Sequence, residues 1–353
     1  MLSHAARVGA QDRLVTLPAE FPFVDLADGR RWTVRVPRTP LGAGHPDARP
    51  PGAGMGEALG GVAALMAASP GHTVAEAVRG RGPMWRAFWE PMATAVLNMA
   101  PEDGSARLLR AALLRSFFRG ARACRPVVAP EGIGAALIDP AVERLEALGV
   151  EMRFREPLAA IGREGARAAS LDLPGGALPL GSEDSVVVAL PPSAAAELVP
   201  GLPVPKPGPA ILNAHFVVRP EAAEAAPPIL GLLGGQAQWL FRRGDVLSVT
   251  ISAAERSRAW GMEREAALAL LWSEVARAVG VADEQPLAAR LLRERGATFD
   301  QSPAGARARP GTRTSLANVF LAGDHVQTGL PATLEGAVLS GRAAARAVLQ
   351  KRG

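Results

Sequence analysis

The chain has 353 residues, of which 48% are hydrophobic and 21% are charged, and its formal net charge is +5. This composition predicts a globular protein with room for two interleaved domains and excludes a mainly disordered chain. No apolar run reaches the roughly 18 residues that cross a bilayer, and no signal sequence follows Met1, so we expect a cytoplasmic protein. The single Cys124 excludes an internal disulfide and is expected to be a buried packing residue.

The positive charge is carried almost entirely by arginine, since only two residues are lysines. No basic run is interleaved with aromatic residues, which argues against a nucleic-acid partner. In a helix over 107–122, one face would hold three arginines: Arg115, Arg119 and Arg122. Such a helix could contact an anionic membrane surface, although a solvated face is the commoner meaning of the pattern. Peripheral contact with the inner membrane surface is therefore an expectation.

The first third of the chain predicts a hairpin followed by helices. Strands are expected at 21–26 and 31–36, on either side of an Asp-Gly turn. Thr73 and Glu76 have the spacing of a helix capping box, and helices should continue to about residue 123. These elements indicate a helical cap domain rather than a nucleotide-binding domain.

The middle of the chain alternates between strands and helices. A helix should end near Gly149, and the alternating segment 150–155 predicts a strand. Further strands are expected at 158–161, 166–173, 186–190, 211–216, 236–241 and 246–252. A helix over about 263–279 follows, which predicts a second sheet-and-helix region.

The last strand, turn and helix carry the clearest ligand signal. The apolar run 319–322 predicts a buried strand that stops at Gly323-Asp324, where a ligand could sit. A helix is expected from about Ala332, with the positive end of its dipole toward the loop. Small residues recur four apart in it: Gly336, Ser340 and Ala344. This arrangement suits an isoalloxazine ring, because flavin reduction places negative charge near N1 and the C2 carbonyl.

The stretch from Leu321 to Ala337 resembles the C-terminal FAD motif of the flavin amine oxidase and phytoene desaturase superfamily. Five further segments resemble the hydroxysqualene dehydroxylases, also described as squalene-associated FAD-dependent desaturases: 21–26, 88–91, 119–126, 213–216 and 247–253. The resemblance implies an α/β fold in which an FAD/NAD(P)-binding Rossmann-like domain is interleaved with an α+β substrate-binding domain. The implied FAD domain covers 126–195 and 304–353. The substrate domain would cover 1–125 and 196–303.

The resemblance also implies FAD as the cofactor. Backbone at Leu158 would meet the adenine, and Asp324 could accept hydrogen bonds from ribityl hydroxyls. The C-terminal motif supplies the other expected FAD-binding residues: Gly323, Asp324, Gly329, Leu330, Pro331, Ala332, Thr333, Glu335, Gly336 and Ala337. The family usually has tryptophan at the His325 position and a basic residue at the Leu339 position, and neither departure touches these backbone contacts.

The resemblance further implies an N-terminal strand, G-x-G-x-x-G and helix that would seat the FAD pyrophosphate. The nearest sequence, 52–60, follows two prolines in a Gly/Pro-rich loop at 40–54 and is expected to lead into a helix. We therefore expect the N-terminal βαβ unit to be absent and Met1 to follow it. Either the start codon is assigned too late or the chain is a fragment.

The reaction that the resemblance implies is reductive removal of the hydroxyl of hydroxysqualene, a hydrophobic isoprenoid, to give squalene for hopanoid synthesis. His215 and Asp300 are candidates for the acid that helps the hydroxyl leave. No metal site is expected, because no His or Cys spacing suits one. The open alternatives are a related carotenoid desaturase, an amine oxidase, and a non-catalytic fragment or partner subunit. The sequence predicts no oligomeric state.

Overall fold

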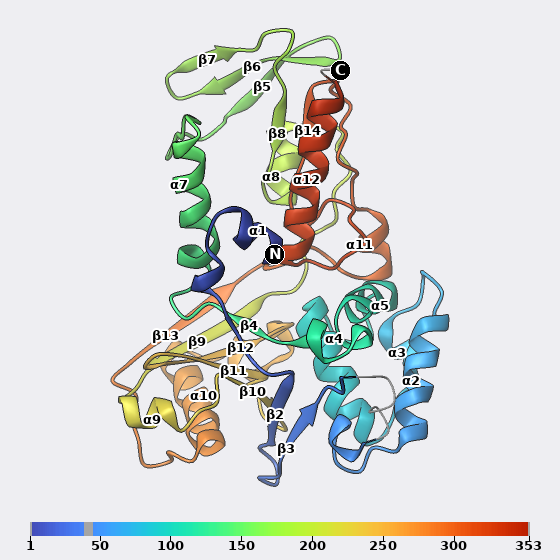
Figure 1. Cartoon of the computed structure of the whole chain (residues 1–353), viewed down its shortest axis with the longest axis vertical. Helices are drawn as coiled ribbons and strands as arrows, with labels where there is room; N and C mark the ends of the chain where they lie inside the picture. The colour runs from blue at the N-terminus through green and yellow to red at the C-terminus, as the bar shows by residue number, and fades with distance from the viewer. Residues whose placement is uncertain (1, 39–44, 352–353) are drawn as a thin grey trace. The chain divides into compact units, whose positions relative to one another are not determined.

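The structure is a computed structural model that describes residues 2–38 and 45–351, so residues 40–44 of the predicted loop lie outside the described residues. The chain divides into two units, each assembled from distant segments (Figure 1). Unit 1 comprises Met1–Arg13, Gly132–Pro207 and Ala304–Gly353, and unit 2 comprises Leu14–Glu131 and Gly208–Pro303. The sequence analysis placed residues 2–13 in the cap, whereas the structure places them in unit 1.

Unit 1 contains the predicted C-terminal strand and helix. β14 (Val319–Leu321) pairs in parallel with β8 (Val186–Val188), and α12 (Leu334–Lys351) packs its small residues against Phe320. β14 is fully buried, as an apolar run of this length predicts. The remaining elements of unit 1 are α1 (Leu2–Arg7), η1 (Gln11–Arg13), η6 (Gly134–Ile138), α7 (Asp139–Ala147), β5 (Ala160–Glu164), β6 (Arg167–Leu173), β7 (Gly176–Pro179), α8 (Pro192–Leu198) and α11 (Pro303–Arg307).

The predicted strand at 150–155 is wrong. The segment is irregular, pairs with no described strand, and leaves Phe154 67% exposed. Arg155 adopts a left-handed φ of 59°, which no extended strand uses. Alternation of apolar and polar residues makes a strand only where a neighbouring strand supplies hydrogen bonds. The strand expected at 158–161 begins later, at Ala160.

Unit 2 is built on a seven-stranded sheet in the order β13-β9-β12-β11-β10-β2-β3. The strands are β2 (Glu20–Asp25), β3 (Arg31–Arg35), β9 (Ile211–Val217), β10 (Ile229–Leu233), β11 (Trp239–Arg243), β12 (Val246–Ile251) and β13 (Ala288–Glu294). The predicted hairpin is β2-β3, and the sequence analysis missed β10 and β13. Along β9 the side chains alternate, so that Leu212, Ala214 and Phe216 enter the core beneath α10 (Arg264–Val279) while Asn213 and His215 face the other side.

Helices gather beside the β2-β3 end of this sheet (Figure 1). They are α2 (Met55–Ala67), α3 (Val74–Val78), η4 (Trp85–Trp89), α4 (Glu90–Leu97), α5 (Ala106–Arg115), η5 (Phe117–Arg119) and α6 (Ala121–Cys124). The predicted capping box is confirmed: Thr73 Oγ1 accepts from Glu76 N at 3.2 Å, and Glu76 Oε2 accepts from Thr73 N at 2.9 Å. The continuous helix expected over 107–122 is wrong, because α5 ends at Arg115 and Gly120 turns the chain with φ at 77°.

The remaining short elements of unit 2 lie between these. They are β1 (Val15–Thr16), β4 (Val127–Val128), η3 (Pro46–Ala48), α9 (Pro220–Glu224), η7 (Ala254–Arg256) and η8 (Arg258–Trp260). All six tryptophans of the chain fall within unit 2. No helix of the described chain combines the length and the apolar character that a bilayer crossing requires.

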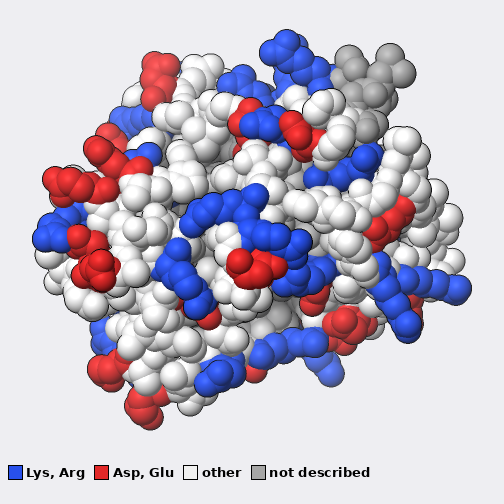
Figure 2. Space-filling model, turned by 90° about the horizontal axis from the view of Figure 1, so that it is seen from below, with Lys and Arg blue, Asp and Glu red and all other residues white. Residues whose placement is uncertain are grey.

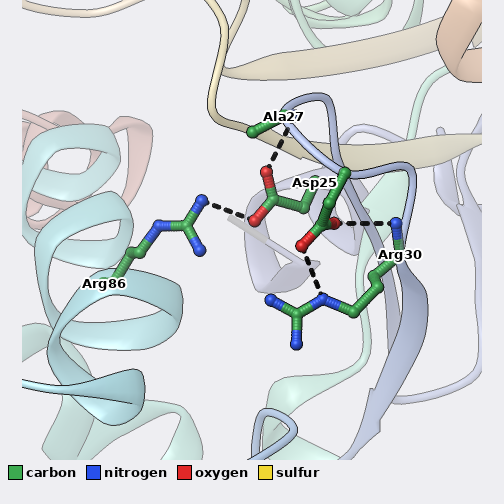
Figure 3. Close-up of polar contacts among 5 residues, drawn as sticks. Asp25, Ala27, Arg30 and Arg86 are labelled. Carbon is green, nitrogen blue, oxygen red and sulfur yellow. Dashed lines mark hydrogen bonds and ion pairs between the residues drawn. The ribbon is translucent and has the colours of Figure 1, made fainter.

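A buried carboxylate joins the end of β2 to the helical part of unit 2 (Figure 3). Asp25 is buried; its Oδ2 lies 2.5 Å from Arg86 Nη2 on η4, and its Oδ1 accepts from Ala27 N at 3.0 Å. Arg30 pairs instead with the exposed Asp28, at 2.7 Å. Basic side chains also gather across the middle of the face seen from below in Figure 2. The ion pair of Asp25 therefore fixes η4 on the sheet, whereas Arg30 remains at the surface.

Cys124 is buried at the end of α6, and burial raises the pKa of its thiol to about 12. This shift makes the thiolate fraction at pH 8 roughly 10³-fold lower than that of an exposed cysteine. Only the thiolate reacts with alkylating reagents, so the thiol should be inert. We expect N-ethylmaleimide to leave the native chain unlabelled on a timescale that labels the urea-unfolded chain completely, as read by mass spectrometry. Equal labelling of the two states would show that Cys124 is accessible.

Candidate functional site

The predicted FAD motif forms a tightly folded loop between β14 and α12. Gly323 ends the strand with φ at 135°, and a Cβ there would lie 2.7 Å from His325 Nδ1. Thr333 precedes the helix: its Oγ1 accepts from Gly336 N at 3.1 Å and donates to Pro331 O at 3.1 Å. The chain therefore turns out of the sheet at a position that only glycine fits, and enters α12 through a side-chain cap.

The first turns of α12 are held close to the strand end. Gly336, Ser340 and Ala344 are buried, as their spacing predicts. Ser340 Oγ accepts from Gly323 N at 2.8 Å and donates to Ala337 O at 2.7 Å. A Cβ on Gly336 would lie 3.2 Å from Pro331 O. The positive end of an 18-residue helix is thereby fixed against the loop, which suits an anionic or electron-rich group.

The sequence analysis missed Arg309, which organises this loop from within. The side chain is 5% exposed and its guanidinium donates to four loop carbonyls. They belong to Asp324 (2.8 Å), His325 (3.1 Å), Val326 (2.6 Å) and Leu330 (2.5 Å). A planar fork with five N–H donors can hold several carbonyls at once. Nothing in the sequence distinguishes Arg309 from the arginines around it at 307 and 313.

His325 is enclosed within the same loop. Among the described residues its buried Nε2 atom has no hydrogen-bond partner. Burial lowers the pKa of His325; the neighbouring Asp324 raises it and Arg309 lowers it further. The neutral imidazole is therefore the favoured form, and one polar atom is left to meet a group that the described side chains do not supply.

Acid is expected to destabilise unit 1 through His325. The pKa of this residue in the folded chain lies below its ordinary value of 6.5, so the unfolded chain binds more protons between the two values. This contribution to stability is complete above pH 6.5 and is lost as the pH falls toward the folded value. Urea midpoints from far-UV circular dichroism between pH 5 and 7.5 should fall less steeply for His325→Phe than for the wild type. Parallel slopes would contradict the assignment.

The structure brings all the predicted FAD-binding residues into unit 1. Leu158 lies in irregular chain before β5 and packs against the core that contains Val319 and Leu321. The other predicted residues lie at the end of β14, in the loop or in the first turn of α12, and most are buried or half-buried. Their contact with FAD itself stays a prediction.

The two candidate acids lie in unit 2, and each has an internal partner. His215 Nδ1 lies 2.8 Å from Ser248 Oγ of β12, and its pKa is lowered by burial and by Arg243 and Arg290. Asp300 Oδ1 accepts from Ser302 N at 2.8 Å, and its Oδ2 from Ser302 Oγ at 3.0 Å. His215 therefore favours its neutral form. The role of either residue as an acid stays a prediction.

A polar surface pocket in unit 2 contains a carboxyl that the sequence analysis did not single out. Glu90, in the first turn of α4, shares this pocket with Glu102, Arg256 and Gln236. Although Glu90 reaches the surface, loss of water around it and the nearby Glu102 raise its pKa. Glu90 thus holds a proton more readily than an ordinary glutamate. The described residues contain no group of three or more His, Cys, Asp or Glu that could hold a metal.

Sequence comparison relates the chain to flavoenzymes. Residues 71–349 match the family described as flavin containing amine oxidoreductase. A hydroxysqualene dehydroxylase of Sinorhizobium fredii is 37% identical over 99% of this chain and 83% of its own length. The enzyme of the same name from Rhodopseudomonas palustris is also 37% identical, over 98% of this chain and 82% of its own.

Solved structures share the fold. Cyclohexylamine oxidase from Brevibacterium oxydans superposes with a TM-score of 0.64 at 13% identity, covering 99% of this chain and 84% of that one. A putative protoporphyrinogen oxidase from an Exiguobacterium species gives a TM-score of 0.63 at 15% identity, covering 99% and 84%. The predicted fold class, a Rossmann-like FAD domain interleaved with an α+β domain, is confirmed.

The loop between β14 and α12 fits a flavin. A Cβ on Gly329 would meet nothing within 4 Å, and the positive end of α12 suits the charge that a reduced flavin carries. The unpartnered Nε2 of His325 is a further polar atom that a bound group could satisfy. The predictions of an FAD-dependent oxidoreductase and of FAD as its cofactor are confirmed by the family match. The chain belongs to the flavin-containing amine oxidoreductase family and, within it, to the hydroxysqualene dehydroxylases.

Proposed function

We propose that this protein removes the hydroxyl group of hydroxysqualene reductively and releases squalene, a precursor for hopanoid synthesis. The observation that supports this substrate is 37% identity, over nearly the whole chain, to proteins named hydroxysqualene dehydroxylase. In the proposed reaction a C–O bond breaks and a C–H bond forms, while a hydride and a proton are consumed and water leaves. Reduced FAD supplies the hydride when it is bound.

The face of the unit 2 sheet that lies opposite the core beneath α10 carries groups that suit such a substrate. One row of paired residues crosses six strands on this face: Asn213, Thr250, Trp239, Gly231, Phe23 and Trp32. The row is polar at one end, where Thr250 Oγ1 donates to Asn213 Oδ1 at 2.8 Å, and aromatic at the other. It therefore presents hydrogen-bonding groups and hydrocarbon-like surface side by side.

The aromatic end of the row is suited to a positively charged transition state. The rings of Phe23 and Trp32 stack with centroids 5.6 Å apart, and Trp239 meets Phe23 edge-on at 5.7 Å. A Cβ on Gly231 would lie 2.2 Å from the Phe23 ring, so glycine is what lets this ring lie across the sheet. Ionisation of an allylic-type alcohol leaves a delocalised cation, which aromatic faces stabilise.

Departure of the hydroxyl as water requires a proton donor. Among the candidates, burial lowers the pKa of His215, whereas burial and Glu102 raise the pKa of Glu90. A proton donor must hold its proton until the hydroxyl leaves, and the pKa of Glu90 is shifted in that direction whereas the pKa of His215 is shifted the other way. We therefore add Glu90 to His215 and Asp300, and expect Glu90→Gln to lower turnover more than His215→Gln does.

The test is an anaerobic assay of the purified chain with FAD, a chemical reductant and hydroxysqualene. Squalene detected by gas chromatography and mass spectrometry, and absent without reductant, is the expected result. The alternatives are assayed separately in air and without reductant, with cyclohexylamine for amine oxidation and phytoene for desaturation, because both reactions reduce the flavin and need an acceptor such as oxygen. The proposal would be overturned if no squalene formed and either the amine gave peroxide or phytoene was desaturated. The absence of tyrosine argues against the aromatic cage common beside the flavin in amine oxidases.

A further inference from the structure

Helix α2 presents an apolar stripe to solvent. Met55, Leu59 and Met66 are 51%, 59% and 42% exposed, and with the exposed Ala63 they lie on one face of the helix. Glu57 is the one charged residue of α2, and it turns inward, where its Oε1 accepts from Met84 N at 3.0 Å. A solvated helix normally carries charges on its outer face, and this one carries none.

An apolar surface pocket opens beside the stripe. Met55, Leu59 and Val62 of α2 line it, together with Phe117 and Phe118 of η5. Phe118 is 39% exposed, so the rim of the pocket continues the apolar surface of the helix. The stripe and the pocket rim together form an exposed hydrophobic surface of the kind that marks an interaction site.

The chain next to this surface is basic and lacks acid. Residues 104–130 contain six arginines and no aspartate or glutamate. Arg110 ties this segment to the end of α2, since its Nη1 donates to Met66 O at 2.8 Å and to Ala68 O at 3.1 Å. Three of the arginines adjoin Phe118 in the chain and are exposed: Arg115, Arg119 and Arg122.

We propose that the stripe of α2, the rim at Phe118 and these three arginines form a docking surface for an anionic phospholipid bilayer. The apolar side chains would enter the level of the acyl chains, and the guanidinium groups would meet the phosphates above them. Charge complementarity selects this occupant, because phosphate headgroups lie directly above acyl chains in such a bilayer, as arginines lie beside apolar side chains here. With 13 residues α2 is too short to span a bilayer, so it would lie in the surface.

The first test is flotation of the full chain with vesicles of phosphatidylcholine alone and with 30% phosphatidylglycerol. We expect binding to the anionic vesicles and weak binding to the neutral ones. The triple change Arg115→Gln, Arg119→Gln and Arg122→Gln should weaken anionic binding roughly 100-fold, because each basic residue near the surface contributes separately. Its matched control replaces Arg264, Arg277 and Arg295, exposed arginines elsewhere in unit 2, by glutamine and should bind like the wild type.

The apolar contribution is tested with a fluorophore. Because Cys124 is buried, Leu59→Cys provides a selectively reactive thiol for an environment-sensitive NBD label. Its emission should shift to the blue on anionic vesicles, while the same label at Leu287→Cys, also exposed in unit 2, should not shift. Absence of wild-type binding to anionic vesicles, equal binding of the two arginine triples, or unshifted NBD emission at residue 59 would each overturn the proposal. Neither measurement depends on the substrate or on turnover.

Discussion

Replacement of Arg309 by methionine is expected to unfold unit 1 and abolish FAD binding. Four loop carbonyls lose their donor at once, and each buried polar group left unsatisfied costs about 1–3 kcal/mol. The sum is comparable to the whole stability of a domain, about 5–15 kcal/mol. Arg309→Lys should be intermediate, because an ammonium keeps the charge but cannot span four carbonyls.

The division of the chain into two units allows unfolding of unit 1 to be measured separately from unit 2. All six tryptophans lie in unit 2, so tryptophan fluorescence follows that unit and is expected to report a native environment in Arg309→Met. Far-UV circular dichroism should lose part of its helical signal, and flavin absorbance should not be retained after FAD reconstitution. Arg346→Met on the exposed side of α12 is the matched control and should behave like the wild type. Full flavin retention by Arg309→Met would mean that the loop does not depend on this arginine.

Gly323→Ala is expected to lower the free energy of unfolding by about 2–4 kcal/mol and to weaken FAD binding at least tenfold. Its φ of 135° is strained for any side chain, and the added Cβ would displace the buried His325 ring. The matched control is Gly341→Ala in α12, where an added Cβ meets nothing within 4 Å. Within α12 that change should stabilise by up to about 1 kcal/mol.

Urea midpoints by circular dichroism and titration of flavin fluorescence would separate the two glycines. If Gly323→Ala bound FAD as tightly as Gly341→Ala, the turn at the end of β14 would not shape the cofactor site.

The parts of this site that sequence reveals are those encoded by neighbouring residues. The strand, the glycine that ends it and the spacing of small residues in α12 are all local patterns, and the structure bears them out. The segment 150–155 shows the limit, since its alternation resembles β9 but no described strand pairs with it. Arg309 could not be found in this way, because its importance comes from carbonyls that lie 15 to 21 residues further along.

The same limit applies in unit 2. β13 is an edge strand that exposes Arg290 on one face and Arg293 on the other, so it lacks the apolar signal of a central strand. Glu90 was quoted only within a resemblance segment, and its raised pKa depends on partial burial and on the nearby Glu102, both of which the fold creates. Family resemblance was therefore needed to predict a reaction. The strand pairing and the burial of side chains, which only the structure gives, were needed to identify residues such as Arg309 and Glu90.

The interleaving of the two units constrains how the protein can be made. The last strand of unit 2 ends at Glu294. Unit 1 is complete only after β14, the only described strand that pairs with β8, and the following α12 have been synthesised. Domains generally fold as units while the chain is being synthesised. Unit 2 would thus mature first, and β8 would remain unpaired through the synthesis of about 130 further residues. Assembly of the predicted FAD-binding loop would then follow the pairing of β14 with β8, because that loop comes directly after β14.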